Sequence, residues 1–397
     1  MSERSDPIVI AASVRTPLGR FQGELSSVPA PRLGSTVIKA AVERAGIAPD
    51  QVGEVLMGCV LPAGQGQAPA RQAARGAGLP DATGATTVNK VCGSGMKAVM
   101  FGHDLITAGS TDIVVAGGME SMSNAPYLLS QARAGYRFGH GQIFDHAALD
   151  GLEDAYERGR SMGTFGEDTA QHYQFDRKSQ DRFADTSLRR AKNAVESGAF
   201  DPEIVPVTVA GKAGNLAIAR DENPLKVSPD KIPTLKPAFR PDGTITAASS
   251  SANADGAAAL VLTRLSIAER EKLPVLAAIR GHASHAQEPA WFTTAPIGAI
   301  NKLLTKVGWS KDEVDLYEIN EAFAVVVMAA MRDLGLDHER VNVHGGACAL
   351  GHPIGATGAR IIVTLLNALE RKGGKRGVAS LCIGGGEATA IAIERLH

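Results

Sequence analysis

Cys92 occupies a corner of the chain where a thiol has the surroundings of a nucleophile. The stretch from 89 to 95, NKVCGSG, joins an apolar lead-in to a glycine-flanked turn. Apolar residues then recur at helical spacing between 96 and 106, which predicts an amphipathic helix that ends at Gly109. The free N–H groups and the positive end of such a helix would favour the thiolate of Cys92 over the thiol. Many free cysteines are simply small buried hydrophobes, so the turn by itself leaves both interpretations open.

Cys382 and His352 offer the groups that acyl chemistry needs beside a nucleophile. Cys382, in LCIGGGEA, follows a predicted strand and precedes three successive glycines. Glycines let backbone N–H groups approach a ligand atom closely, as an oxyanion hole requires. His352 precedes Pro353, which is predicted to occupy the first position of a helix, and a histidine there suits a general base. A hydrogen-bonded core histidine is the alternative.

Two further motifs place polar side chains in apolar or glycine-rich stretches. His344, Cys348 and His352 are spaced by four residues, which on a continuous helix would put them on one face as metal ligands. Glycines and a proline interrupt that segment, so a metal site is not expected there. In EINEAFA, Asn320 either holds a water molecule or caps the helix that follows.

The composition describes a globular chain without an overall preference for polyanions. The 397 residues are 44% hydrophobic and 21% charged, and 41 basic against 42 acidic residues leave a formal net charge of −1. This balance argues against nucleic acid or an anionic membrane surface as a partner. No signal peptide or membrane span is recognised, so the cytoplasm is the expected compartment. The four cysteines contain no C-x-x-C pair and are expected to be reduced.

The chain contains two similar halves. AGIAPDQVGEVLMG from Ala45 resembles VGWSKDEVDLYEIN from Val307, and two further pairs of segments match at nearly the same offset. Each match joins a short β-branched run to a glycine corner near a helical stripe, which predicts a mostly parallel sheet in a layered α/β protein. A segment with charge-dense and proline-rich stretches interrupts the first half and is predicted to be an insertion. The predicted domains are 1–121 with 247–270, the insertion 122–246, and 271–397.

As a set, and in this order, NKVCGSGMKAV, NEAFA, GGACALGHPIGATGAR and LCIGGGEA closely resemble the motifs of the thiolase family. The similarity covers nearly the whole chain, including GQGQAPARQAA at 64–74 and SSSANADGAAAL at 249–260. The resemblance implies two α-β-α halves that form a five-layered core, a loop domain inserted in the first half, and a homotetramer built from dimers. It also implies reversible condensation of two acetyl-CoA to acetoacetyl-CoA and CoA through an acyl-cysteine, a place in fatty acid metabolism, and no cofactor or metal besides the substrate coenzyme A.

Carried over by position, the resemblance implies a role for each motif residue. Cys92 would be acylated, His352 would activate it, and Cys382 would remove the α-proton of the second acetyl-CoA. Asn320 would hold a water that polarises a thioester carbonyl, and the backbone N–H groups of Cys92 and Gly384 would form an oxyanion hole. The residues expected to contact coenzyme A are Leu152, Met162, Lys226, Lys231, Phe239, Ala247, Ser251 and Phe323.

The acyl chain and the competing functions stay open at this point. Ser161 stands where acetyl-specific biosynthetic thiolases normally have a histidine, so the sequence does not determine the preferred chain length. Lys226 and Lys231 belong to a basic set in the insertion that could face either coenzyme A phosphates or solvent. One alternative is a degradative thiolase acting on longer 3-ketoacyl-CoA. A decarboxylating ketoacyl synthase would need a histidine in place of Asn320, and a non-catalytic CoA- or lipid-binding protein would not need four intact motifs.

Overall fold

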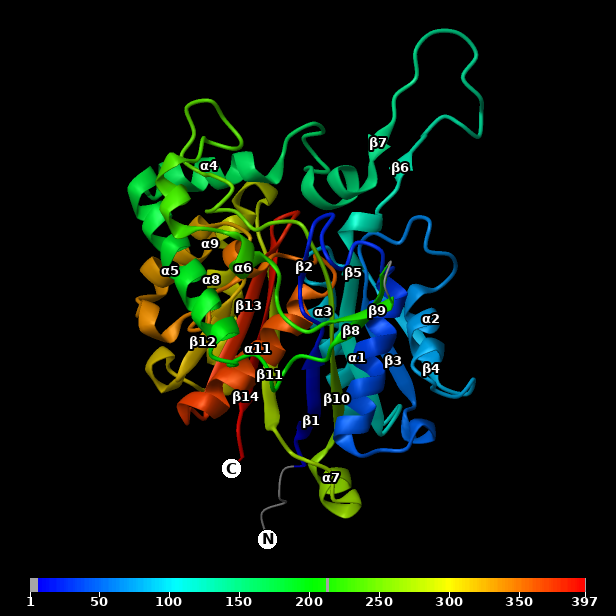
Figure 1. The fold of residues 1–397 in the computed structure, drawn as a ribbon. Coiled ribbons are helices and arrows are strands. Elements are labelled where there is room, and N and C mark those ends of the chain that lie inside the picture. Colours follow the sequence, from blue (N-terminus) through cyan, green and yellow to red (C-terminus); the bar gives the residue numbers. More distant parts are fainter. Residues whose placement is uncertain (1–5, 212–213, 397) are drawn as a thin grey trace.

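The structure is a computed structural model that describes residues 6–211 and 214–396, and it stacks helices and strands in five layers (Figure 1). The middle layer is a pair of helices, α3 (Ser94–Thr107) and α11 (Thr357–Lys372), which pack against each other. Strands lie on both sides of this pair. Four helices cover the outer faces of the strands: α1 (Ala30–Ala45) and α2 (Pro69–Gly76) on one face, α8 (Ala295–Val307) and α9 (Ala324–Leu334) on the other.

The strands repeat in the same order on both sides of a central pair. In the first half they are β1 (Ile8–Arg15), β3 (Glu54–Gly58), β4 (Gly84–Val88), β5 (Ile113–Ser121) and β10 (Ala254–Arg264). In the second half they are β11 (Ala277–Ala286), β12 (Leu316–Ile319), β13 (Arg376–Ile383) and β14 (Glu387–Glu394). Across the described sheet the order is β12-β13-β14-β11-β1-β10-β5-β3-β4, with the short β2 (Gly19–Arg20) paired to β10. Outward from β1 and β11, the strands β10, β5 and β3 correspond to β14, β13 and β12, which is the duplication predicted from the sequence.

The prediction of a mostly parallel sheet is wrong. β3 runs parallel to β4 and β5, and β12 runs parallel to β13, but β10, β1, β11 and β14 all pair antiparallel with their neighbours. The strands β13 and β14 are joined by a three-residue glycine turn instead of a helix, which reverses the chain direction. Because a strand buried on both faces is an apolar run in either orientation, periodicity did not distinguish the two cases.

The insertion leaves the first half after β5 and returns before β10 (Figure 1). Its first part is an arm, residues 125–146, that projects from the body of the molecule. No helix in the described ranges is both long and apolar enough to cross a bilayer. The elements of the insertion are β6 (Tyr127–Leu128), β7 (Phe144–Asp145), α4 (Met162–His172), α5 (Arg177–Glu196), β8 (Val207–Gly211), β9 (Gly214–Ile218) and α6 (Asn223–Lys226).

Candidate active site

The N-terminal ends of α3 and α11 meet, and this contact brings reactive loops of both halves together. A Cβ atom on Gly95 would lie 2.9 Å from the backbone nitrogen of Ala359, and Gly358 packs against the first turn of α3 in the same way. Side chains at these glycines would hold the two helix backbones apart. Since Cys92 and His352 lie just before the two helices, the packing places both residues at the same junction.

Cys92 stands at a helix start, as predicted, but its surroundings do not favour the thiolate. Burial of the sulfur raises the pKa of the thiol to about 11. The backbone N–H groups of Gly384 and of Cys92 itself point at the sulfur and offset only part of this shift. The expected thiolate is therefore corrected to a neutral thiol, which needs a base before it can attack a carbonyl.

His352 has the protonation state and the orientation of a general base. Burial, together with the nearby Arg360 cation, lowers its pKa to about 3, so the ring is neutral. Its Nδ1 lies 2.6 Å from Thr357 Oγ1, whose own proton is donated to the carbonyl oxygen of Pro353. Nδ1 therefore carries the ring proton and Nε2 carries the free lone pair. Within the described residues Nε2 has no hydrogen-bond partner, which leaves it available to take a proton from a thiol.

The helix that follows His352 starts later than predicted. The sequence places Pro353 at its first position, whereas α11 begins at Thr357. Residues 353–356 form a turn in which the N–H groups of Ala356 and Thr357 both donate to the carbonyl oxygen of Pro353, at 2.9 and 3.0 Å. Because of this turn, the His352 ring bonds to the first side chain of α11 and not to the free N–H groups of a helix end.

Cys382 lies fully buried at the end of β13 and close to Cys92. Burial and the charge of Cys92 both raise the pKa of its thiol well above the ordinary value. Its apolar cluster includes Phe323, and Met162 and Phe239 pack against this cluster. Three of the residues expected to contact the substrate thus belong to, or pack against, the cluster that contains the second thiol.

The turn after Cys382 aims a backbone N–H group at Cys92. Gly385 and Gly386 have φ angles of 92° and 88°, in the left-handed region where a side chain is strained. These two residues reverse the chain into β14, and the preceding Gly384 presents its N–H group to the Cys92 sulfur. The pair of N–H groups from Cys92 and Gly384 has the arrangement of an oxyanion hole.

Asn320 is buried with an unsatisfied side chain. Only 1% of its surface is exposed, and neither its Oδ1 nor its Nδ2 has a hydrogen-bond partner in the described part of the chain. It does not cap α9, which begins at Ala324 with Phe323 as the capping residue. Because a buried amide without partners is costly, a water molecule or a substrate atom is required at this position. This is the geometry expected of a residue that holds a water.

The backbone around Ser251 connects the Asn320 loop to the His352 loop. The N–H of Ser251 donates to the carbonyl oxygen of Ala322 at 2.9 Å, and the N–H of His352 donates to that of Ala252 at 2.8 Å. The two loops therefore face each other across one extended segment. The four motifs, which lie far apart in the sequence, line a single site.

Comparison with known proteins bears on what this site does. Two family models match, "Thiolase, N-terminal domain" over residues 8–266 and "Thiolase, C-terminal domain" over residues 273–395. The chain belongs to the thiolase family. It is 50% identical over 400 residues to acetyl-CoA acetyltransferase 2 of Arabidopsis thaliana, covering 100% of this chain and 99% of that protein.

Two solved thiolase-fold structures superpose closely on the whole chain. The crystal structure of the Bacillus anthracis acetyl-CoA acetyltransferase has a TM-score of 0.96 at 42% identity and covers 100% of both chains. The Acat5 thiolase of Ascaris suum, solved in complex with coenzyme A, has a TM-score of 0.93 at 42% identity and covers 98% of this chain and 100% of its own. The predicted thiolase fold is thus confirmed.

Glu120 positions the His352 loop of this thiolase and was not predicted. Its carboxylate accepts hydrogen bonds from the N–H groups of Gly355, at 2.9 Å, and of Val60 and Leu61, at 2.9 and 3.2 Å. Burial raises the pKa of this carboxyl to about 7. The sequence does contain an indication of this role, because a glutamate stands inside the buried strand IVVAGGMES. A buried carboxylate needs hydrogen-bond partners, but the hydrophobic pattern does not show which residues these are.

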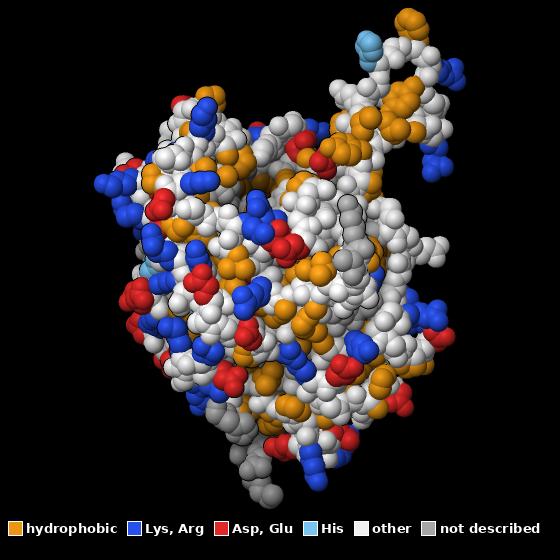
Figure 2. Space-filling model, in the orientation of Figure 1, with side chains coloured by type: hydrophobic (Ala, Val, Ile, Leu, Met, Phe, Trp, Pro, Cys, Tyr) orange, Lys and Arg blue, Asp and Glu red, His pale blue; other side chains and the backbone are white. Residues whose placement is uncertain are grey.

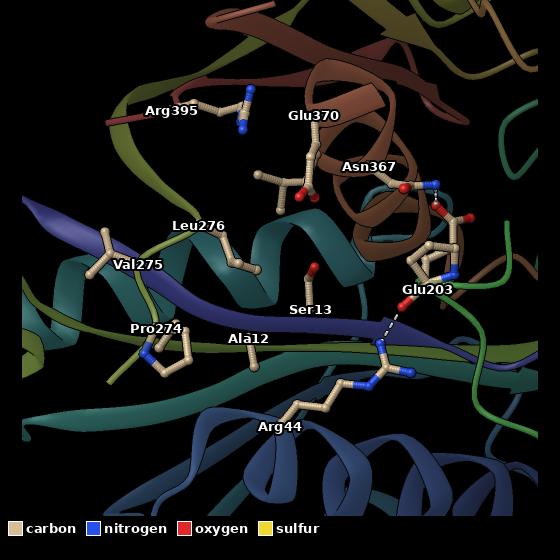
Figure 3. Close-up of a pocket in the computed structure, with 13 residues that line it drawn as sticks. Ala12, Ser13, Arg44, Glu203, Pro274, Val275, Leu276, Asn367, Glu370 and Arg395 are labelled. Atoms are coloured by element: carbon tan, nitrogen blue, oxygen red, sulfur yellow. Dashed lines mark hydrogen bonds between the residues drawn. The ribbon is translucent and has the colours of Figure 1, made fainter. Parts of the chain in front are cut away.

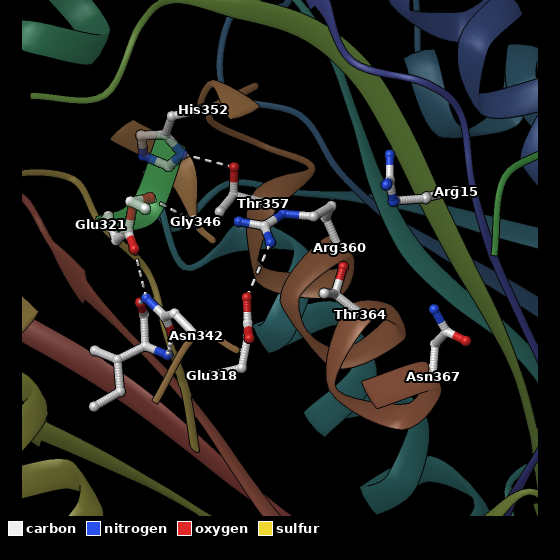
Figure 4. A network of polar contacts seen from close by, with 12 residues as sticks. Arg15, Glu318, Glu321, Asn342, Gly346, His352, Thr357, Arg360, Thr364 and Asn367 are labelled. Atoms are coloured by element: carbon white, nitrogen blue, oxygen red, sulfur yellow. Dashed lines mark hydrogen bonds and ion pairs between the residues drawn. The ribbon is translucent and has the colours of Figure 1, made fainter. Parts of the chain in front are cut away.

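A stripe of polar side chains on α11 was also missed by sequence reasoning. Figure 4 shows Thr357 beside His352, followed along the helix by Arg360, Thr364 and Asn367. Arg360 forms a buried ion pair with Glu318 at 3.3 Å, and Thr364 donates to Glu203 at 3.1 Å. Since these groups are buried, their bonds fix the rotation of α11 and with it the position of Thr357. The buried polar residues of α11 are Thr357, Arg360, Thr364 and Asn367.

The other residues predicted to contact the substrate differ in burial and do not all lie near the cysteines. Leu152 packs, as Cys92 does, against the cluster that contains Ile354, whereas Ala247 is exposed. Lys226 is exposed with its Nζ 4.0 Å from Glu24, and Lys231 is exposed in a separate turn. No measured contact joins either lysine to the cysteines within the described residues, so their binding to coenzyme A stays a prediction.

His344, Cys348 and His352 lie in three different surroundings. The ring of His344 packs edge to face on Phe200, with centroids 5.8 Å apart. The Sγ of Cys348 donates to the carbonyl oxygen of Glu321 at 3.6 Å. Among the described residues these three side chains do not form a metal-ligand cluster.

A pocket of about 460 Å³ opens elsewhere, between β1 and α11 (Figure 3). Its walls include Ser13, Arg44, Asn367 and Arg395. The Arg44 guanidinium already bonds to the carbonyl oxygens of Pro202 and Ile204. The lining contains no cysteine or histidine, so the pocket lacks the groups for acyl transfer.

Proposed function

We propose that this thiolase catalyses the reversible condensation of two acetyl-CoA molecules to acetoacetyl-CoA and CoA. One observation carries the proposal: a thiol with two N–H donors, a neutral imidazole with a free Nε2 and a second buried thiol come from separate loops to one site. The chain is accordingly an acyltransferase. Relatives named acetyl-CoA acetyltransferase support the acetyl group as the group transferred.

In the first half-reaction, Cys92 takes the acetyl group. His352 Nε2 accepts the thiol proton while the sulfur attacks the thioester carbonyl, and the N–H groups of Cys92 and Gly384 stabilise the oxyanion. The CoA thiolate leaves and recovers the proton from the imidazolium. Because the resting thiol and imidazole are both neutral, proton transfer has to accompany the attack.

In the second half-reaction, His352 Nε2 takes the thiol proton of Cys382, and the resulting thiolate removes an α-proton from a second acetyl-CoA. The resulting carbanion attacks the acetyl carbon on Cys92, and the water held by Asn320 stabilises the enolate oxygen. Cys92 leaves as a thiolate and takes the proton from the His352 imidazolium, which restores both thiols and the neutral imidazole. Acylation prepares this step, because an acylated Cys92 cannot ionise, and a Cys92 thiolate would oppose ionisation of Cys382.

Coenzyme A enters this scheme as substrate and product, and we expect no other cofactor and no catalytic metal. The apolar side chains of Met162, Phe239 and Phe323 around Cys382 provide a surface for the pantetheine. The solved Ascaris suum complex with coenzyme A supports this choice of partner. The cytoplasm as compartment and a place in fatty acid metabolism stay predictions.

We further propose that the protein is a homotetramer whose subunits meet through the arm. Phe138 is fully exposed on the arm, and Tyr127 and Ile143 are 69% and 65% exposed. Figure 2 shows hydrophobic side chains gathered along this projection. An isolated chain would leave this apolar surface in water. Light scattering is expected to give four times the mass of one chain, and the mass of a single chain would contradict the proposal.

A thiolysis assay across 3-ketoacyl-CoA chain lengths, at fixed coenzyme A, tests the proposed substrate. We expect kcat/KM to be highest with acetoacetyl-CoA and to fall as the acyl chain lengthens. Ser161 makes this the decisive measurement, because its hydroxyl caps α4, at 3.4 Å from the N–H of Gly163, instead of supplying an imidazole. A preference for chains of eight or more carbons would instead indicate a degradative thiolase.

A further inference from the structure

His103, Asp104 and His282 form a cluster that the acyl-transfer scheme does not use. His103 and Asp104 lie near the C-terminal end of α3, and His282 lies within β11, so the cluster joins the two halves. Asp104 Oδ1 lies 3.1 Å from His103 Nδ1 and 2.9 Å from His282 Nε2. The two imidazole rings meet edge to face, with centroids 5.0 Å apart. Both ring nitrogens therefore face one carboxylate oxygen.

These atoms have the chemistry and the spacing of a metal-ligand set. One ligand atom from each residue lies within 4.8 Å of the other two. Imidazole nitrogens and carboxylate oxygens bind zinc at about 2.0–2.2 Å, which puts the ligand atoms of one ion about 3.0–3.5 Å apart. The two nitrogen-to-oxygen distances in the cluster, 3.1 and 2.9 Å, are already close to this separation.

The electrostatics of the cluster favour a cation. Asp104 lies near the negative end of the α3 dipole, where a carboxylate is unfavourable unless a positive charge compensates it. Lys306, whose Nζ donates to the carbonyl oxygen of His282 at 3.1 Å, opposes a cation and moderates the affinity.

We propose that His103, Asp104 and His282 bind a divalent transition-metal ion of the zinc type. His103 would coordinate through Nδ1 and His282 through Nε2, each in the tautomer that carries its proton on the other nitrogen. Water completes the coordination on the side where Asp104 is 52% exposed. The ion ties α3 to β11, and it lies about 17 Å from Cys92 at the helical rise per residue, so it takes no part in acyl transfer.

A calorimetric titration of the chelator-treated enzyme with zinc tests the site. Wild type is expected to bind one zinc ion per chain at this site. His282→Ala and Asp104→Asn are expected to bind that ion about 10–100-fold more weakly. His140→Ala, which removes an exposed histidine of the arm, serves as the matched control and should bind like wild type. Any zinc held by the catalytic thiols is common to all four proteins and cancels in the comparison.

Two further readouts separate metal binding from folding and from catalysis. Zinc should raise the thermal midpoint of wild type and of His140→Ala but not that of His282→Ala. Thiolase turnover of the chelated wild type and of Asp104→Asn should stay close to normal, which also shows that the variant is folded. Equal zinc affinity in wild type and both cluster variants, or no binding to wild type at 1 mM zinc, would overturn the proposal.

Discussion

Replacing Cys92 with alanine is expected to abolish acetylation by acetyl-CoA and to lower turnover by about 10⁴-fold or more. The thiol is the group to which both N–H donors of the proposed oxyanion hole point. Alanine keeps these donors and the His352 base but removes the atom that forms the bond. Mass spectrometry after brief exposure to acetyl-CoA should therefore show a gain of one acetyl group on wild type and none on the variant.

Cys348→Ala is the matched control for this experiment. Cys348 lies beside the site, and its sulfur makes a weak hydrogen bond to the backbone carbonyl of Glu321. Its loss should leave acetylation and turnover close to wild type, provided that the thermal midpoint is preserved. An acetyl group found on Cys92→Ala at another residue, with turnover retained, would contradict the assignment of the nucleophile.

The parts of this site that sequence patterns predicted are those determined by short segments. The residues before and after Cys92 and Cys382 form their own turns, so a thiol at a helix start and a glycine turn after a strand could be inferred locally. The duplication was equally accessible, because each half repeats its own succession of strand, glycine corner and helix. The antiparallel pairs were not, since strand direction depends on how distant segments connect.

The charge states at the site depend on contacts between distant segments and could not be predicted. A helix start suggested a thiolate at Cys92, but enclosure by both halves desolvates the sulfur and raises its pKa to about 11. The tautomer of His352 depends on Thr357, and the position of its loop depends on Glu120, which lies 235 residues away from Gly355. The pKa of Cys92, the tautomer of His352 and the position of its loop all depend on burial of polar side chains between the two halves. A short stretch of sequence does not show this burial.

Replacing Cys382 with alanine is expected to separate acetylation from condensation. The variant retains Cys92, His352 and the N–H groups of the oxyanion hole, so it should still take up one acetyl group. It lacks the sulfur that accepts the α-proton, so condensation and overall thiolysis should fall by about 10²–10⁴-fold, the usual loss when a general acid or base is removed. The substitution leaves only a small cavity in the cluster around Phe323.

The comparison of acetylation with turnover in Cys382→Ala distinguishes a catalytic thiol from a structural one. If Cys382 only packed in the core, its loss would weaken both steps together through instability, and a lowered thermal midpoint would accompany the loss. If it removes the α-proton, a stable variant should accumulate the acetyl-enzyme, because the first half-reaction proceeds and the second does not. A folded variant that stays unacetylated, or one that turns over at a near-normal rate, would show that the two thiols do not divide the reaction in this way.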